Sequence, residues 1–109
     1  MTWKIEYLNE AKKDLEKQDH NVQLQVLKGI RKVAENPVSI YDGGYGKPLG
    51  NKQGLNLAGL MKIKFRDLGI RVVYKVEYTD TVMRIIVISA RNDNDVYMLA
   101  EKRKKKYNL

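Results

Sequence analysis

Cysteine is absent from the 109 residues of the chain, and His20 is the only histidine. Disulfide bonds and thiolate-bound metals are therefore excluded. No cluster of acidic residues accompanies His20, and neither Ser39 nor Ser89 has a histidine nearby in the sequence. The sequence thus predicts no metal site, no other cofactor and no serine–histidine nucleophile.

Long apolar stretches are also missing. No apolar run approaches the roughly 18 residues that a membrane-spanning helix needs. The first seven residues (MTWKIEY) lack the apolar segment of a signal peptide, and a cysteine-free chain suits the cytoplasm. We therefore expect a cytoplasmic protein that makes no membrane contact.

Acidic side chains are few, with 13 Asp and Glu against 21 Lys and Arg, which gives a net charge of +8. Such an excess points to an anionic partner, which is a nucleic acid, an acidic protein or, less readily, a membrane surface. Since 43% of the residues are hydrophobic, the chain is expected to fold as one domain over residues 1–109 with a single core.

Residues 60–78 (LMKIKFRDLGIRVVYKVEY) carry the clearest structural pattern, two alternating runs that meet at a turn-like Asp67-Leu68-Gly69 step. The pattern predicts an antiparallel hairpin. In its first strand one row is apolar (Met61, Ile63 and Phe65) and the opposite row is cationic (Lys62, Lys64 and Arg66). Three neighbouring cations repel one another unless a polyanion or water lies against them, so this row is the main functional clue.

The remaining pattern predicts a short strand over residues 3–7, a helix from residue 10 to about 17, and a second helix that Pro37 ends near residue 35 or 36. Residues 38–53 read as a long irregular loop, either a solvated connector or a functional segment. A central strand is expected over residues 82–89, and Val96 lies in the opening of a last helix. The order is β-α-α-β-β-β-α, an α+β fold whose small, mainly antiparallel sheet has one face covered by the helical hairpin.

Single residues of the first two helices support more specific predictions. Asn9 and Asp19 are expected to cap them, and Asp14 is expected to face solvent. Gly29 lies inside the second helix, where it costs about 1 kcal/mol relative to alanine. A close contact of this helix with another helix or with the sheet would explain why Gly29 is tolerated.

Five residues from the predicted hairpin and the segment after the last strand suggest a site for RNA: Lys62, Lys64, Arg71, Arg91 and Tyr97. Guanidinium groups bind phosphate, and a tyrosine ring stacks on an unpaired base. A lysine among arginines is expected to have a lowered pKa and to act as a base near neutral pH. Asp93 and Asp95 are interpreted as helix-capping residues. Whether Arg71 lies opposite Lys62 depends on the register of the hairpin.

These residues also resemble a known family. The K-x-K pair, the R-V-V-Y run after a short turn and the R-x5-Y spacing are similar to those of the RelE/ParE toxin superfamily, as are the Asn36-Pro37 break and residues 87–89 (VIS). The resemblance is closest to the RelE branch of ribosome-dependent mRNA endonucleases, and the order of the elements fits over essentially the whole chain.

The resemblance implies a role for each of the five residues in metal-independent RNA cleavage. Lys62 and Lys64 match paired strand lysines, the second of which is the proposed general base that acts on a ribose 2′-hydroxyl. Arg71 matches the arginine that stabilises charge on the phosphate, and Arg91 the one proposed to protonate the leaving 5′-oxygen. Tyr97 resembles the tyrosine that stacks on an mRNA base.

Further RNA contacts are expected from the basic row and from the cationic run near the C-terminus, through Lys62, Arg66, Lys102, Lys104 and Lys105. The implied partners are mRNA in the ribosomal A site and a cognate acidic antitoxin. Two alternatives stay open at this point. One is a ParE-like inhibitor of DNA gyrase, and the other is a basic RNA-binding module without catalytic activity.

Overall fold

The computed structural model describes residues 2–52 and 54–109 and has the α+β architecture that the sequence predicts. Its elements follow one another as β1 (Lys4–Tyr7), α1 (Asn9–Glu16), α2 (His20–Val33), the 3₁₀ turn η1 (Ile40–Asp42), β2 (Lys47–Lys52), β3 (Leu55–Phe65), the 3₁₀ turn η2 (Arg66–Leu68), β4 (Ile70–Glu77), β5 (Val82–Ser89) and α3 (Asp93–Lys106).

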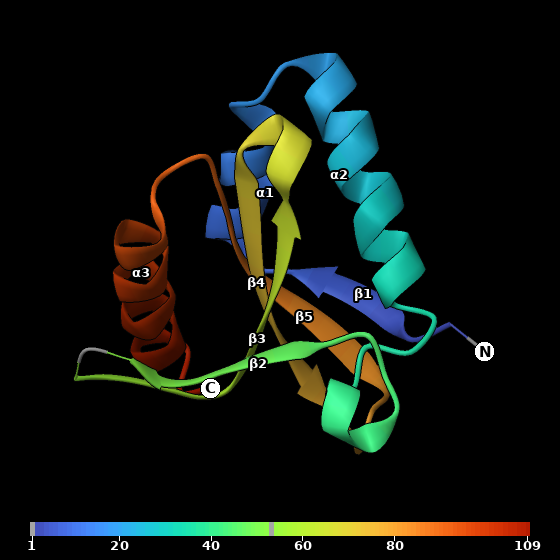
Figure 1. Cartoon of the computed structure of the whole chain (residues 1–109), viewed down its shortest axis with the longest axis vertical. Coiled ribbons are helices and arrows are strands. Elements are labelled where there is room, and N and C mark those ends of the chain that lie inside the picture. The colour runs from blue at the N-terminus through green and yellow to red at the C-terminus, as the bar shows by residue number, and fades with distance from the viewer. Residues whose placement is uncertain (1, 53) are drawn as a thin grey trace.

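The strands form one sheet in the order β1-β5-β4-β3-β2 (Figure 1). Neighbouring strands are antiparallel except for β1, which pairs with β5 in parallel. The two central strands, β4 and β5, are the most apolar and the most buried, as expected for strands covered on both faces. Among the described helices, none is both long and apolar enough to cross a membrane.

The prediction that residues 38–53 form an irregular loop is wrong in its second half. Residues Lys47–Lys52 form the edge strand β2, which pairs with the long strand β3, while Gln53 lies outside the described residues. Pro48 is compatible with this position because an edge strand need not donate every backbone hydrogen bond to the ladder. The register shifts between Pro48 and Gly50, whose φ of 64° suits glycine. Glycine and proline content alone therefore concealed a strand.

The predicted β3–β4 hairpin is confirmed, and its register is now defined. Gly69 follows η2 with a φ of 66°, in the left-handed region that favours glycine. Lys64 lies directly opposite Arg71, whereas Lys62 lies opposite Val73. The hairpin thus pairs Arg71 with Lys64, not with Lys62. Arg66 belongs to η2, so the expected cationic row of three on β3 contains only Lys62 and Lys64.

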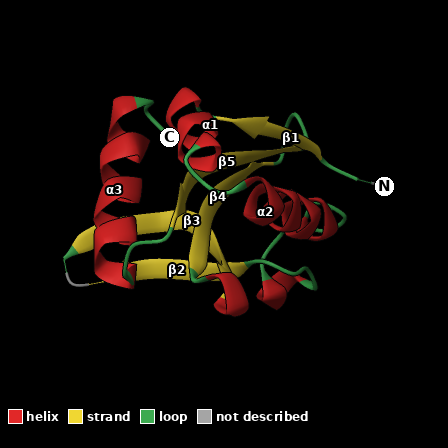
Figure 2. Ribbon diagram, turned by 90° about the horizontal axis from the view of Figure 1, so that it is seen from above, coloured by secondary structure: helices red, strands yellow, loops and turns green. Residues whose placement is uncertain are grey.

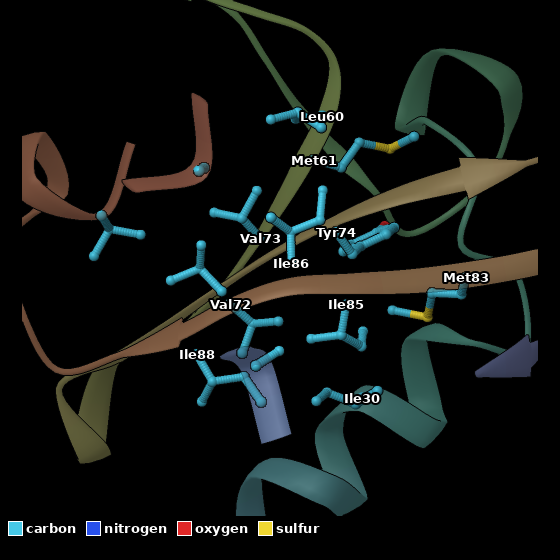
Figure 3. Packing of buried hydrophobic residues seen from close by; sticks show 14 of the residues in the cluster. Ile30, Leu60, Met61, Val72, Val73, Tyr74, Met83, Ile85, Ile86 and Ile88 are labelled. Atoms are coloured by element: carbon cyan, nitrogen blue, oxygen red, sulfur yellow. The ribbon is translucent and has the colours of Figure 1, made fainter. Parts of the chain in front are cut away.

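The helices divide between the two faces and one edge of the sheet. Helix α2 covers one face, where Ile30 packs beside Met83 and Ile85 (Figure 3). Helix α3 lies on the opposite side of β4 (Figures 1 and 2). Helix α1 follows β1 and runs beside the outer edge of β5. Helix α1 packs against β5 and β1 and also contacts α3 through the ion pair of Asp14 with Arg103.

Helix α2 makes a close contact with the sheet at Gly29, as expected from the sequence. A Cβ atom at this position would lie 2.3 Å from Cε1 of Phe65, the last residue of β3. A glycine is therefore required for the ring to lie against the helix backbone.

The expectation that Asp14 faces solvent is wrong, because Asp14 is buried in an ion pair with Arg103 of α3. Asp14 Oδ2 accepts hydrogen bonds from Arg103 Nη1 at 2.7 Å and from the backbone N–H of Ile88 at 3.1 Å, and Arg103 Nη1 also donates to the carbonyl of Ile86 at 2.9 Å. Strand β1 pairs with β5 only as far as Ile85. The buried pair thus satisfies backbone groups of β5 beyond the end of β1.

The helix ends differ in detail from the prediction. Asn9 is the first residue of α1 and Leu8 occupies the N-cap position, so Asn9 is not the cap. Asp19 occupies the N-cap position of α2, as expected, but its side chain makes no capping hydrogen bond, and α2 ends at Val33. Helix α3 is capped by Asn92, whose side chain accepts a hydrogen bond from the backbone N–H of Asp95 at 3.0 Å. Asp93 and Asp95 lie in the first turn of α3, where acidic side chains favour the helix dipole.

Candidate functional site

Lys64 and Arg71 meet at the N-terminal end of α3. They are cross-strand partners on β3 and β4, so their side chains leave the same face of the sheet. Both reach the carboxylate of Asp93, the first residue of α3. Lys64 Nζ lies 3.2 Å from Asp93 Oδ2, and Arg71 Nε donates to Asp93 Oδ1. About a third of each basic side chain is exposed (32% for Lys64 and 28% for Arg71).

Asp93 is held as an anion between these two cations. Partial burial acts to raise the pKa of Asp93, but hydrogen bonds and charge from Lys64 and Arg71 outweigh this effect, so the pKa lies below its ordinary value. The two basic groups thus converge on one negatively charged oxyacid group. Such a pair of donors is suited to any anion of similar size, including a phosphate.

Arg91 joins this site through its backbone. Its carbonyl oxygen accepts a hydrogen bond from Arg71 Nη1 at 2.9 Å, and its N–H donates to Ser89 Oγ at 3.1 Å. The residue is exposed and borders a different cavity of about 330 Å³, which Lys17, the residue after α1, also lines. The structure therefore brings Lys64 and Arg71 together with the Arg91 backbone, and Arg91 is also one of the residues that line the neighbouring cavity.

Tyr97 lies one turn after Asp93 on α3 and is only 5% exposed. Burial raises the pKa of its hydroxyl, and the charge of Asp93 adds to this effect while Arg71 opposes it. The ring is thus close to the two charged groups but covered. Stacking of Tyr97 on an RNA base would require α3 to move, a requirement that the sequence did not reveal.

The other predicted RNA contacts lie at two separate places. Lys62 is partly buried beside the site on β3, opposite Lys47 of β2, and Arg66 is exposed on η2. Lys102, Lys104 and Lys105 lie near the C-terminal end of α3. Lys104 is eleven residues beyond Asp93, about 16 Å along the helix axis. The structure therefore does not bring the C-terminal cations to the Lys64–Arg71 site.

Most of the C-terminal cations already contact groups of the protein. Lys104 Nζ donates to the carbonyl of Ala58 at 3.0 Å, and Lys105 pairs with Glu101 at 3.5 Å. Lys106 lies 2.9 Å from Glu10, whose pKa falls to about 2 because Tyr107 and Lys106 donate hydrogen bonds to its carboxylate. Together with the buried Arg103, these contacts attach the end of α3 to α1 and β3.

Sequence reasoning missed the part that Asp93 plays. The residue was interpreted as a helix cap, and the capping residue is Asn92. The signal was present in the sequence, as an acid placed between two predicted site residues, Arg91 and Tyr97.

Within residues 2–52 and 54–109, no three His, Cys, Asp or Glu side chains come together in a group that could hold a metal ion.

Comparisons with known proteins agree with this fold. Residues 5–94 match the family model of the ParE toxin of the type II toxin–antitoxin system parDE. The match covers most of the chain, so the protein belongs to this toxin family of the RelE/ParE superfamily.

A RelE-like toxin protein of Escherichia coli is 28% identical over 103 residues, which are 94% of this chain and 98% of that protein. Among solved structures, a mutant of the E. coli toxin RelE in the free state has a TM-score of 0.71 at 26% identity and covers 94% of this chain and 98% of its own. The intact E. coli RelBE toxin–antitoxin complex has a TM-score of 0.64 at 23% identity, with 83% and 98% of the chains covered. This last likeness concerns the fold alone.

Proposed function

We propose that this toxin is a metal-independent endoribonuclease that cleaves mRNA in the ribosomal A site. The observation that carries the proposal is the convergence of Lys64 and Arg71, from opposite positions on two paired strands, on one anionic group. Rigid strands hold both donors in place, which is the preorganisation that stabilisation of a charged transition state needs. Similarity to E. coli RelE at 26% identity and to a RelE-like toxin protein at 28% identity supports the proposal, since the family resemblance implies this reaction.

In the proposed reaction Lys64 is the general base that takes the proton from a ribose 2′-hydroxyl. The 2′-oxygen attacks the adjacent phosphorus, and Arg71 binds the non-bridging oxygens as charge builds on them. The bond to the 5′-oxygen breaks, and Arg91 gives that oxygen a proton. The products are a 2′,3′-cyclic phosphate and a 5′-hydroxyl. Lys62 lies on the same row as Lys64 and contributes positive charge, while Tyr97 stacks on a base.

Substrate must displace Asp93 in this reaction, since its carboxylate occupies the two donors that the phosphate would use. In the proposal, Asp93 withdraws by a movement of the first turn of α3. The same movement would uncover Tyr97, which lies one turn further along this helix. Engagement of the phosphate and exposure of the stacking ring are therefore coupled in the proposal.

A cognate antitoxin is the second proposed partner. The matching family is defined as the toxin of a toxin–antitoxin system, and one of the similar structures is such a complex. An acidic antitoxin would complement the net charge of +8 and would compete with RNA for the basic surface. The C-terminal cations Lys102, Lys104 and Lys105 are proposed contacts for either partner.

Primer extension on cellular mRNA after induced expression tests the proposed reaction. The wild-type toxin is expected to produce cuts within translated codons and to arrest growth. Arg71→Ala should lower cleavage about 10² to 10³-fold, as removal of one donor to a developing anion does. Arg31→Ala, which removes an exposed arginine of α2, serves as the matched control. Equal activity of the two variants, with the fold intact, would contradict the assignment of Arg71.

Inhibition of DNA gyrase is the competing function, and the match to the ParE family model specifically favours it. A supercoiling assay with purified gyrase separates the two functions. An endoribonuclease leaves supercoiling unaffected, whereas a gyrase inhibitor blocks it and leaves mRNA uncut. A protein that binds RNA but shows neither effect is the third case, a basic RNA-binding module.

A further inference from the structure

A second basic surface lies between α2 and η2, and Lys64 is one of its residues. A cavity of about 530 Å³ separates α2 from the end of β3 and η2, and the residues that line it are Gln25, Lys28, Gly29, Lys32, Lys64, Phe65, Arg66, Asp67 and Leu68. Four of these residues are cationic. Asp67 is the one carboxylate among the described lining residues, so the surroundings of the cavity are strongly positive.

The cations of this cavity differ from those at the C-terminus in one important respect. Lys28, Lys32 and Arg66 are exposed, and no described carboxylate forms an ion pair with any of them. Lys104 and Lys105, by contrast, are held by protein groups. Unmatched like charges around a concave surface repel one another, and an anion bound between them relieves this repulsion.

Local structure explains why these side chains share one surface. Lys28 and Lys32 are four residues apart on α2, which places their Cβ atoms about 6 Å from each other on the same side of the helix. The Gly29 backbone lets the Phe65 ring lie against the helix at the residue after Lys28. The cavity thus combines two rows of positive charge with an aromatic wall, the combination that single-stranded nucleic acid binds through phosphates and bases.

The cavity also adjoins a second cavity that Arg71 lines. Lys64, Phe65 and Arg66 line both this cavity and a neighbouring one of about 250 Å³ that includes Arg71. A chain of phosphates could therefore pass from α2 across η2 to Arg71 without leaving positively charged surface.

We infer that the cavity between α2 and η2 binds the backbone of single-stranded RNA next to the linkage that is cleaved, with Lys28, Lys32 and Arg66 as phosphate contacts. The inference rests on the proposed function in taking RNA as the anion. It commits to RNA rather than an acidic protein because the surface leads directly to Lys64 and Arg71 and carries an aromatic wall. Lys28 and Lys32 were not singled out from the sequence.

The test measures binding separately from cleavage. The probe is a fluorescein-labelled single-stranded RNA of about twelve nucleotides, a length in the usual range of such sites, with 2′-O-methyl riboses that block cleavage. The full-length toxin is compared with Lys28→Gln/Lys32→Gln and with Lys12→Gln/Lys13→Gln. The second variant removes the same charge from exposed positions on α1 and is the matched control. Thermal unfolding of each variant checks its fold.

The cavity variant, Lys28→Gln/Lys32→Gln, is expected to bind the RNA about tenfold more weakly than wild type. The control, Lys12→Gln/Lys13→Gln, should change the affinity less than about twofold. The slope of log K against log salt should fall by about 1.4 in the cavity variant, since each lost phosphate contact on a single strand contributes about 0.7. Arg66→Gln alone should lower the slope by about 0.7, which keeps the test available if the double variant unfolds.

Three results would overturn the inference. The first is unchanged RNA binding by the cavity variant, and the second is an equal loss of RNA binding in both double variants. The third comes from the same binding assay with poly-glutamate as the probe. If the cavity variant lost affinity for poly-glutamate but not for RNA, the cavity would be assigned to an acidic protein. Failure of the proposed function gives a different result. Primer extension would then find no cuts, while the affinity for the non-cleavable RNA would still depend on Lys28 and Lys32.

Discussion

The guanidinium of Arg71 donates a hydrogen bond from Nε to the carboxylate of Asp93, 22 positions further along the chain. Lys64 Nζ binds the other oxygen of the same carboxylate. A negatively charged side chain of the toxin thus occupies the position where the proposed reaction needs a phosphate. The N-terminal turn of α3 therefore covers the Lys64–Arg71 pair in the isolated chain.

Removal of the Asp93 charge should make the toxin bind and cleave RNA better. Asp93→Asn is expected to raise RNA affinity about fivefold, because the ion pair that substrate must displace is partly exposed and contributes about 1 kcal/mol or less. Affinity for the non-cleavable RNA and the rate of cleavage on ribosomes are the measurements. Asp95→Asn removes an exposed acid from the same helical turn and should have little effect. Weaker binding by Asp93→Asn would mean that Asp93 supports the RNA site.

Acid should release the contact between Asp93 and its two cations. The pKa of Asp93 is lower in the folded protein than its ordinary value of about 3.9, so its contribution to stability is present above that pH and is lost as the pH falls through the folded pKa. The difference in free energy of unfolding between wild type and Asp93→Asn should be constant from about pH 5 to 7 and should shrink below about pH 4. Urea unfolding over a pH series measures this difference. A difference that grows on acidification would contradict the prediction.

The buried ion pair between Asp14 and Arg103 should be required for stability. Asp14→Ala leaves the Arg103 guanidinium without its partner and the N–H of Ile88 without its acceptor, and should lower the free energy of unfolding by about 3–5 kcal/mol. Glu16→Ala, at an exposed position of the same helix, should change it by less than about 0.5 kcal/mol.

A double variant, Asp14→Leu/Arg103→Met, tests the reason for the Asp14→Ala effect. Replacing both charges by apolar groups should recover much of the lost stability, since the large cost comes from one unpaired buried charge. Urea denaturation is the measurement for all three variants. No recovery in the double variant would assign the effect to the backbone hydrogen bonds of β5 instead.

Gly29→Ala should destabilise the protein, although alanine favours a helix by about 1 kcal/mol over glycine. The added Cβ would lie 2.3 Å from the Phe65 ring, so the ring or the helix must shift, at a net cost of about 1–3 kcal/mol. The same substitution in a Phe65→Leu background should cost less, because the smaller side chain leaves room. Equal costs in both backgrounds, measured by thermal unfolding, would show that the contact with Phe65 is not the cause.

Local patterns predicted much of the fold correctly. The alternation on each side of Gly69 predicts the β3–β4 hairpin, and helical spacing predicts α2 and its close approach at Gly29. Strand β2 was not predicted, since an edge strand that contains Pro48 and Gly50 has weak local preferences and forms because the long neighbour β3 offers backbone partners.

The candidate site was predicted by residue type but not by arrangement. The sequence marks Lys64, Arg71 and Arg91 as basic residues of strands and turns, yet the pairing of Arg71 with Lys64 follows from the register of the hairpin. Both the burial of Tyr97, a residue of α3, and the contact of Asp93 with Arg71 follow from the docking of α3 on the sheet.

Charge and hydrophobic periodicity are properties of short segments, so the sequence by itself determined the excess of positive charge, the hairpin and the main helices. Contacts between distant segments decided the rest. Asp14 and Arg103 are 89 positions apart and look like ordinary surface charges in the sequence, but the incomplete edge of β5 makes them a buried pair. Likewise, the packing of α2 and α3 on opposite sides of the sheet leaves Lys28 and Lys32 without an ion pair to any described carboxylate and places Asp93 on Arg71.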